Sequence, residues 1–124
     1  MNIKQLIEKE NERHKVALTT IKSCKGLEEY VSFVNENCIY LRTHLYSLKE
    51  SQNVLHKFKE KLGNYKLLNY YMNSDETIAV QYTFGSIVVI LFCRDVEEML
   101  KKVSGGKCRV EKHMHEENKI VCDI

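Results

Sequence analysis

The sequence predicts an α+β protein in which an N-terminal, coiled-coil-like helical hairpin precedes a small, mostly antiparallel sheet, in the order α-α-β-β-β-α-β-β. Apolar side chains recur at the helical period over residues 2–24 and, for about five heptads, over residues 27–62. From residue 65 onward the period changes to two, which is typical of strands. We therefore expect a single domain over residues 1–124, with a helical hairpin for oligomerisation over 1–64 and a β-rich part over 65–124.

The composition is that of an ordinary globular chain. Of its 124 residues, 44% are hydrophobic and 29% are charged, and the formal net charge of +2 favours neither nucleic acid nor a membrane surface. No stretch approaches the ~18 apolar residues of a membrane helix. Five cysteines without a CxxC pair, and no secretory signal, predict reduced cysteines and a cytoplasmic protein.

The first helix is expected over residues 2–24. Its apolar side follows a four-three spacing, and Glu10 and His14 stand within that spacing, one turn apart. The side is formed by Ile3, Ile7, Glu10, His14, Ala17 and Ile21. Two interpretations stay open: the polar pair is the loosely specified middle of a short antiparallel helix, or it sets register and oligomeric state. Gly26 ends the helix.

The second helix is expected over residues 27–62 and would be roughly 55 Å long, longer than a domain of this size is wide. One compact domain cannot cover an apolar seam of that length, so the seam predicts a second helix or another copy of the chain. Only Gln52 and Lys59 interrupt it. The residues predicted to mediate oligomerisation are Leu27, Val31, Val34, Cys38, Leu41, Leu45, Leu48, Leu55 and Leu62.

The second half of the chain predicts strands over residues 65–72, 77–84 and 87–93, the last of them apolar on both faces like a central strand. Asp95 and Glu98 match a capping box and predict a short helix after it.

The last hairpin can be registered from its own alternation of side chains. With a three-residue loop over 115–117, Cys108 and Cys122 share one face of the hairpin. On the opposite face, Arg109 lies across from Asp123.

The patterns that carry catalysis or metal binding do not occur in the sequence. No CxxC or HxxxH spacing predicts zinc, no cysteine has a nucleophile signature, and Gly105-Gly106-Lys107 lacks the spacing of a phosphate-binding loop. We therefore expect no enzyme, no metal and no cofactor. Lysines near the end of the second helix alternate with Glu50 and Glu60, which argues against nucleic acid as a partner.

A binding function is the remaining hypothesis. An arginine and an aromatic ring can enclose a purine while further cations bind phosphate. The residues predicted to bind a small anionic nucleotide are Tyr82, Phe84, Arg94, Lys107, Arg109 and His113.

The expected order of elements, with the stretches GSIVVILFCRD (residues 85–95) and GGKCRVEKHMHEENKIVCD (residues 105–123), resembles the phage Thoeris anti-defence proteins that sequester cyclic ADP-ribose signals. The resemblance implies a phage-encoded, oligomeric, non-catalytic protein that binds a cyclic nucleotide between subunits in the host cytoplasm. It carries over no site residue. Two alternatives stay open: an inhibitor that binds a host or defence protein through an exposed helix face, and a small nucleic-acid-binding regulator.

Overall fold

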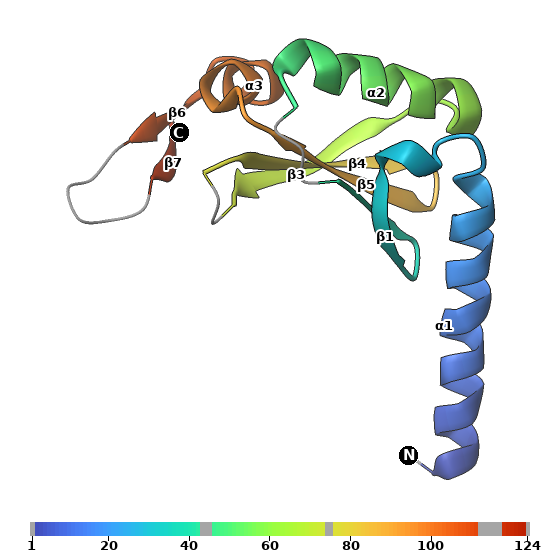
Figure 1. Cartoon of the computed structure of the whole chain (residues 1–124). Coiled ribbons are helices and arrows are strands. Elements are labelled where there is room, and N and C mark those ends of the chain that lie inside the picture. Colours follow the sequence, from blue (N-terminus) through green and yellow to red (C-terminus); the bar gives the residue numbers. More distant parts are fainter. Residues whose placement is uncertain (1, 43–45, 74–75, 112–117, 124) are drawn as a thin grey trace.

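The computed structural model describes residues 2–42, 46–73, 76–111 and 118–123. A five-stranded sheet forms its centre, and helices α2 (Leu48–Leu62) and α3 (Val96–Ser104) lie over one face of that sheet (Figure 1). Helix α1 (Ile3–Ser23) projects from one end of the molecule (Figure 1). A separate hairpin of β6 (Cys108–Glu111) and β7 (Lys119–Cys122) lies at the other end.

The sheet has the strand order β1-β2-β5-β4-β3. Its strands are β1 (Val31–Asn35), β2 (Cys38–Leu41), β3 (Lys66–Met72), β4 (Ile78–Phe84) and β5 (Ile87–Cys93). Strand β2 is parallel to β5, with Cys38 beside Val88, and all other neighbours are antiparallel. The three strands predicted between residues 65 and 93 are thus present as one antiparallel unit, and β1 and β2 extend it.

The prediction of one long helix over residues 27–62 is wrong. The chain forms a short 3-10 turn (Glu28–Tyr30), then β1 and β2, before α2 begins at Leu48, so the order is α-β-β-α-β-β-β-α-β-β. Residues 30–41 are rich in β-branched and aromatic side chains, which favour strands. Glu36 adopts a φ of 53° in the turn between β1 and β2, a conformation that no α-helix contains. Strand pairing therefore overrides an apolar spacing that also fits a helix.

The residues predicted along the oligomerisation seam lie on several elements instead of one. Leu27, Leu41 and Leu55 are buried in the core of their own chain. Leu45 lies outside the described residues. Val31 and Val34 lie on β1, Cys38 on β2, and Leu48 and Leu62 on α2. No single helix contains this seam, so a coiled coil along it is not formed.

Helix α2 provides most of the cover for the sheet. Its buried residues are Ser51, Val54, Leu55 and Phe58. Their spacing of three or four places them on one side of the helix. The Ser47 hydroxyl accepts a hydrogen bond from the backbone N–H of Glu50 at 3.1 Å, and Asp95 Oδ2 accepts one from the N–H of Leu48 at 2.8 Å. Asp95 was predicted to cap the helix that follows it, but α3 has no side-chain cap and the carboxylate stabilises the start of α2.

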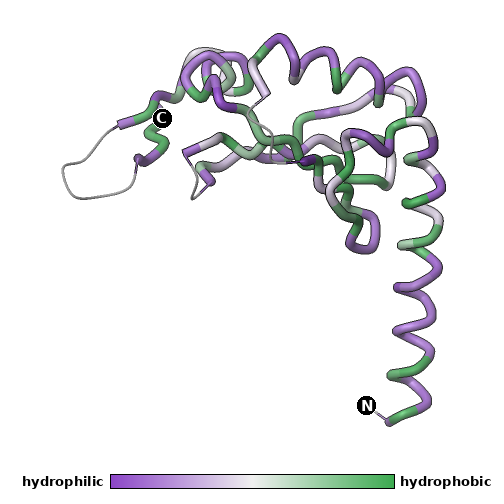
Figure 2. Tube along the Cα trace, viewed as in Figure 1, coloured by the Kyte–Doolittle hydropathy of each residue, from purple (hydrophilic) through white to green (hydrophobic). Residues whose placement is uncertain are grey.

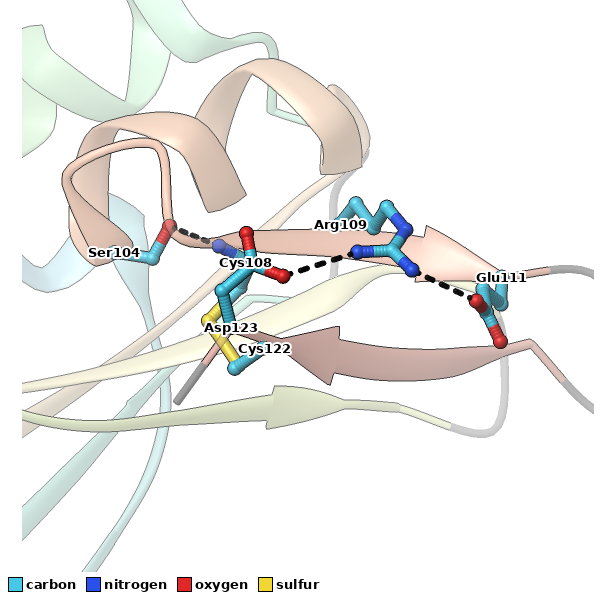
Figure 3. A network of polar contacts seen from close by, with 6 residues as sticks. All are labelled: Ser104, Cys108, Arg109, Glu111, Cys122 and Asp123. Carbon is cyan, nitrogen blue, oxygen red and sulfur yellow. Dashed lines mark hydrogen bonds and ion pairs between the residues drawn. A yellow bond between two sulfur atoms is a disulfide. The ribbon is translucent and has the colours of Figure 1, made fainter.

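The C-terminal hairpin corrects a further prediction. Cys108 lies directly opposite Cys122, two residues from the predicted register, and the two side chains form a disulfide bond (Figure 3). A shift of two residues keeps every side chain on its predicted face, so the alternation could not distinguish the two registers. The prediction that all cysteines are reduced is wrong for this pair, whereas Cys24, Cys38 and Cys93 are free thiols. The predicted loop over 115–117 lies outside the described residues.

Candidate functional site

The candidate site is a pocket of about 210 Å³ between α2, α3 and the β3–β4 side of the sheet. It is lined by Leu48, Gln52, Leu55, Tyr65, Leu67, Tyr82, Met99, Lys102 and Val103. Depressions of about 300 and 400 Å³ lie beside α1, and both are more open to solvent than this pocket. Exposed polar side chains line most of the smaller one. Ligand sites in proteins are mainly apolar with a few polar groups, which describes the pocket below α2 and α3 best.

Both helices contribute one continuous side to the pocket. Leu48, Gln52 and Leu55 of α2 are spaced by four and three residues, and Met99, Lys102 and Val103 of α3 by three and one, so each set shares a helix side. Leu55 and Met99 are buried at the base, with 4% and 1% of their surface exposed. The two helices that cover the sheet thus form the walls, because the pocket lies where their inner sides meet.

An aromatic group forms the floor on the sheet side. Tyr65 lies edge-on to Tyr82, with ring centroids 5.2 Å apart, and its ring is 5.1 Å from that of Phe84 at a tilt. Such edge and tilted contacts are the favoured geometries of aromatic pairs. Burial raises the pKa of the Tyr82 phenol to about 12, so the neutral hydroxyl is favoured here even more strongly than in water. At neutral pH it is protonated, as any tyrosine is, and can donate a hydrogen bond.

Two polar side chains stand at the outer part of the pocket. Lys102 is exposed, and so is Gln52 on the facing helix. Lys102 makes no ion pair with another described residue. No carboxylate, histidine or cysteine is among the described lining residues, and the ionisable side chains of the pocket are Lys102, Tyr65 and Tyr82. The arrangement suits binding of a flat apolar group with an anionic or carbonyl group near Lys102.

The structure places the sequence-predicted ligand residues apart from one another. Tyr82 lines the pocket, and Phe84 is buried beside it with 3% of its surface exposed. Arg94 follows β5 and lies 3.7 Å from Glu50, Nη2 to Oε1. Among the described predicted cations, Arg94, Lys107 and Arg109, none lines this pocket.

Of the remaining predicted cations, Arg109 lies on β6 and Lys107 just before it. Arg109 Nη2 is 3.1 Å from Glu111 Oε1, and its Nη1 is 3.5 Å from Asp123 Oδ1 (Figure 3). Lys107 is exposed just before β6. His113 lies outside the described residues. Because two carboxylates flank its guanidinium, Arg109 has less free charge for a ligand than the sequence indicated.

Sequence reasoning missed Lys102, Gln52 and Tyr65. Gln52 was taken for an interruption of the seam, and Lys102 stands where the predicted short helix has its solvated side. The one available signal was the aromatic residue Tyr65, two residues after the glycine that ends α2, because an aromatic side chain at a helix end often packs onto the neighbouring core.

Comparisons with protein-family models, with curated proteins and with solved structures found no match. Among the described residues, no three histidine, cysteine or acidic side chains converge in a way that could hold a metal ion. In the same part of the chain, no helix has both the length and the apolar character needed to cross a membrane.

Proposed function

We propose that this protein is a non-enzymatic binding protein that captures a small ligand with an aromatic body and one anionic group. The observation that carries the proposal is the pocket between α2, α3 and β4, in which Tyr65 and Tyr82 form an aromatic floor and Lys102 stands at the mouth. The ring of the ligand lies against the tyrosines, and its anion lies close to the ammonium group.

The size of the pocket limits what can enter it. Drug-sized ligands occupy pockets of about 300–1,000 Å³, whereas this one measures about 210 Å³. One ring system therefore fits inside, and any larger part of the ligand stays outside. A nucleotide meets this condition with its base in the pocket and its phosphate at Lys102. The cyclic nucleotide signal implied by the resemblance to anti-defence proteins belongs to the same class and stays a prediction.

The experiment compares three probes that separate the ring from the anion. Adenosine monophosphate has both parts, adenosine has only the ring, and inorganic phosphate has only the anion. We expect saturable shifts in the amide spectrum around α2 and α3 for the first, weaker binding for the second, and none at the pocket for the third. The nucleotide recovered afterwards should be unchanged, since the protein is proposed to bind and not to react.

Neighbouring lysines of α3 provide a matched pair of variants. Lys102→Gln should weaken binding of adenosine monophosphate by about three- to tenfold, the range of a partly exposed ion pair of ~0.7–1.4 kcal/mol. Lys101→Gln removes an equal charge from the same helix, but outside the pocket, and should leave affinity unchanged. Equal losses in both variants, or shifts that follow salt concentration alone, would favour the nucleic-acid alternative instead.

A further inference from the structure

Helix α1 leaves a row of large apolar side chains in solvent. The exposed fractions are 74% for Ile3, 56% for Ile7 and 51% for Ile21. Apolar segments alternate with polar ones along α1, which projects beyond the sheet (Figure 2). Thr20 is the one buried residue of α1. Most of the stability of a helix in a protein comes from packing of its apolar side, which α1 leaves largely uncovered.

The outer residues of the apolar row of α1, Ile3, Ile7 and Ile21, are exposed. In the middle of the row, Glu10, His14 and Ala17 border a depression that the end of β1 also lines. At about 100° per residue, Ile3, Ile7, Glu10, His14, Ala17 and Ile21 lie within an arc of about 80°. The centre of that arc is about 100° around the helix from Thr20, the side chain that contacts the body. The contact with the body continues along the Thr20 side, where Arg13 Nε lies 3.3 Å from Glu36 Oε1 beside β1. The side of the arc that faces away from β1 is open to a second helix alongside.

The order of residues in this arc is symmetric about residue 12. Read in reverse, the row pairs Ile3 with Ile21, Ile7 with Ala17, and Glu10 with His14. In an antiparallel coiled coil, these are the pairs that meet in successive layers, because an a position of one helix faces a d position of the other. We infer that α1 binds α1 of a second copy of this chain in an antiparallel two-fold pair.

The polar residues select this partner and this direction. In the antiparallel pair, Glu10 faces the partner's His14, and the two-fold axis repeats the contact, so each acidic group meets a basic one. A parallel pair would place Glu10 against the partner's Glu10 in the middle of an apolar row. Arg13 lies next to the arc, with Nη1 3.2 Å from Glu10 Oε1, and adds a second positive charge at this layer. The opposed helix dipoles favour the same direction.

The first test is the dependence of mass on concentration, measured by sedimentation. The wild type should pass from monomer to dimer as concentration rises into the high micromolar range, and Ile7→Asp should shift this transition at least tenfold. Val16→Asp is the matched control, because Val16 is also exposed, at 41%, but lies about 140° from the centre of the arc. A wild type that stays monomeric throughout, or equal shifts in both variants, would overturn the inference.

The second test addresses the charge pair. Glu10→Lys should weaken the dimer at least tenfold, since the new ammonium would face the partner's His14. The double variant Glu10→His with His14→Glu exchanges the charges and should restore wild-type dimerisation. Glu8→Lys makes the same charge change on an outward position of the helix and serves as control. Unchanged dimerisation of Glu10→Lys would rule out this register.

The third test reports direction. Ile7→Cys combined with Ala17→Cys should form covalent dimers under mild oxidation, because position 7 meets position 17 of the partner. The two positions of one helix are ten residues or about 15 Å apart along the axis, too far for a bond within one chain. Ile7→Cys alone should not cross-link in an antiparallel pair. Efficient 7-to-7 links, identified in peptides by mass spectrometry, would show a parallel pair and refute the antiparallel one.

Discussion

Helices α1 and α2 are both amphipathic, but only α2 packs its apolar side against the core of its own chain. Helix α2 buries Ser51, Val54, Leu55 and Phe58 within 15 residues, whereas α1 buries Thr20 alone within 21. The apolar side of α2 is covered by the sheet of its own chain, and the apolar side of α1 is left open. The helical period of apolar residues therefore shows that one side of a helix must be buried, but not whether the same chain or another chain buries it.

Attachment to the rest of the chain explains the difference. Strand β2 leads into α2 and β3 leaves it, and Asp95 from beyond β5 binds its first turn, so α2 is held at both ends. Helix α1 is held only along its C-terminal half, where Arg13 pairs with Glu36 and where Thr20 and Cys24 are buried. Its other end has a capping box of its own, in which Asn2 and Gln5 exchange hydrogen bonds of 2.9 and 3.1 Å. That box supports the helix locally without joining it to the core.

The largest expected effect contrasts an apolar residue from each helix. Phe58→Ala should lower the free energy of unfolding by about 3–5 kcal/mol, because a fully buried ring that packs on Phe84 is replaced by a cavity. Ile7→Ala should change it by less than about 0.5 kcal/mol at concentrations where the protein is monomeric. Urea unfolding followed by tyrosine fluorescence measures both, since the chain has seven tyrosines and no tryptophan. Similar losses in the two variants would mean that α1 packs on its own chain.

An effect of intermediate size is the pH dependence of stability, which tests whether water reaches the side of the sheet that α2 and α3 cover. Burial raises the pKa of Tyr82 to about 12 from 10. The unfolded chain therefore releases this proton first as pH rises, and stability that is complete below pH 10 is lost between about pH 10 and 12. The loss attributable to this group is about 2–3 kcal/mol.

The comparison variant for this pH effect is Tyr82→Phe, which keeps the ring and removes the ionisable hydroxyl. Its stability should fall less steeply above pH 10 than that of the wild type, while Tyr65→Phe, at a residue with 36% of its surface exposed, should follow the wild type. Parallel curves for all three proteins would indicate that water reaches Tyr82 and that the pocket floor is more open than the structure shows.

The sequence predicted those elements whose partners lie nearby in the chain. The first helix, the three antiparallel strands from β3 to β5, and α3 occur close to their predicted ranges, because a short turn brings their apolar periods together. Strands β1 and β2 were missed because β2 pairs with β5, as in the contact between Cys38 and Val88. Apolar residues spaced by three and four can also arise from two short strands and a turn, and local spacing cannot distinguish the two.

The candidate site was harder to predict than the fold. Tyr82 was recognised from its place as an aromatic residue on a strand, but Lys102 is one of several lysines on a charged helix side. Three separate segments contribute the other lining residues, so only the packing of α2 and α3 on the sheet brings them together. The disulfide between Cys108 and Cys122 was missed for a related reason, since a register of two residues more or less leaves the alternation unchanged.

The smallest expected effect compares the N-terminal caps of the two helices. Ser47→Ala removes the side-chain acceptor for the N–H of Glu50 and should lower the free energy of unfolding by about 1 kcal/mol, since α2 is part of the cooperative core. Asn2→Ala removes a chemically similar cap, the acceptor for the N–H of Gln5. In the monomer it should leave global unfolding unchanged within about 0.3 kcal/mol, because the free end of α1 can fray on its own.

The same cap variant should behave differently once α1 is paired. In an antiparallel dimer the end of α1 near Asn2 lies beside the partner's Ile21, so fraying opens the interface, and Asn2→Ala should weaken dimerisation by up to about fivefold, as expected for ~1 kcal/mol of lost helix stability. Ser47→Ala should leave dimerisation unchanged. Ser47→Ala should therefore lower the stability of the monomer alone, and Asn2→Ala should weaken the dimer alone. A variant that weakened both folding and dimerisation equally would contradict the separation of α1 from the core.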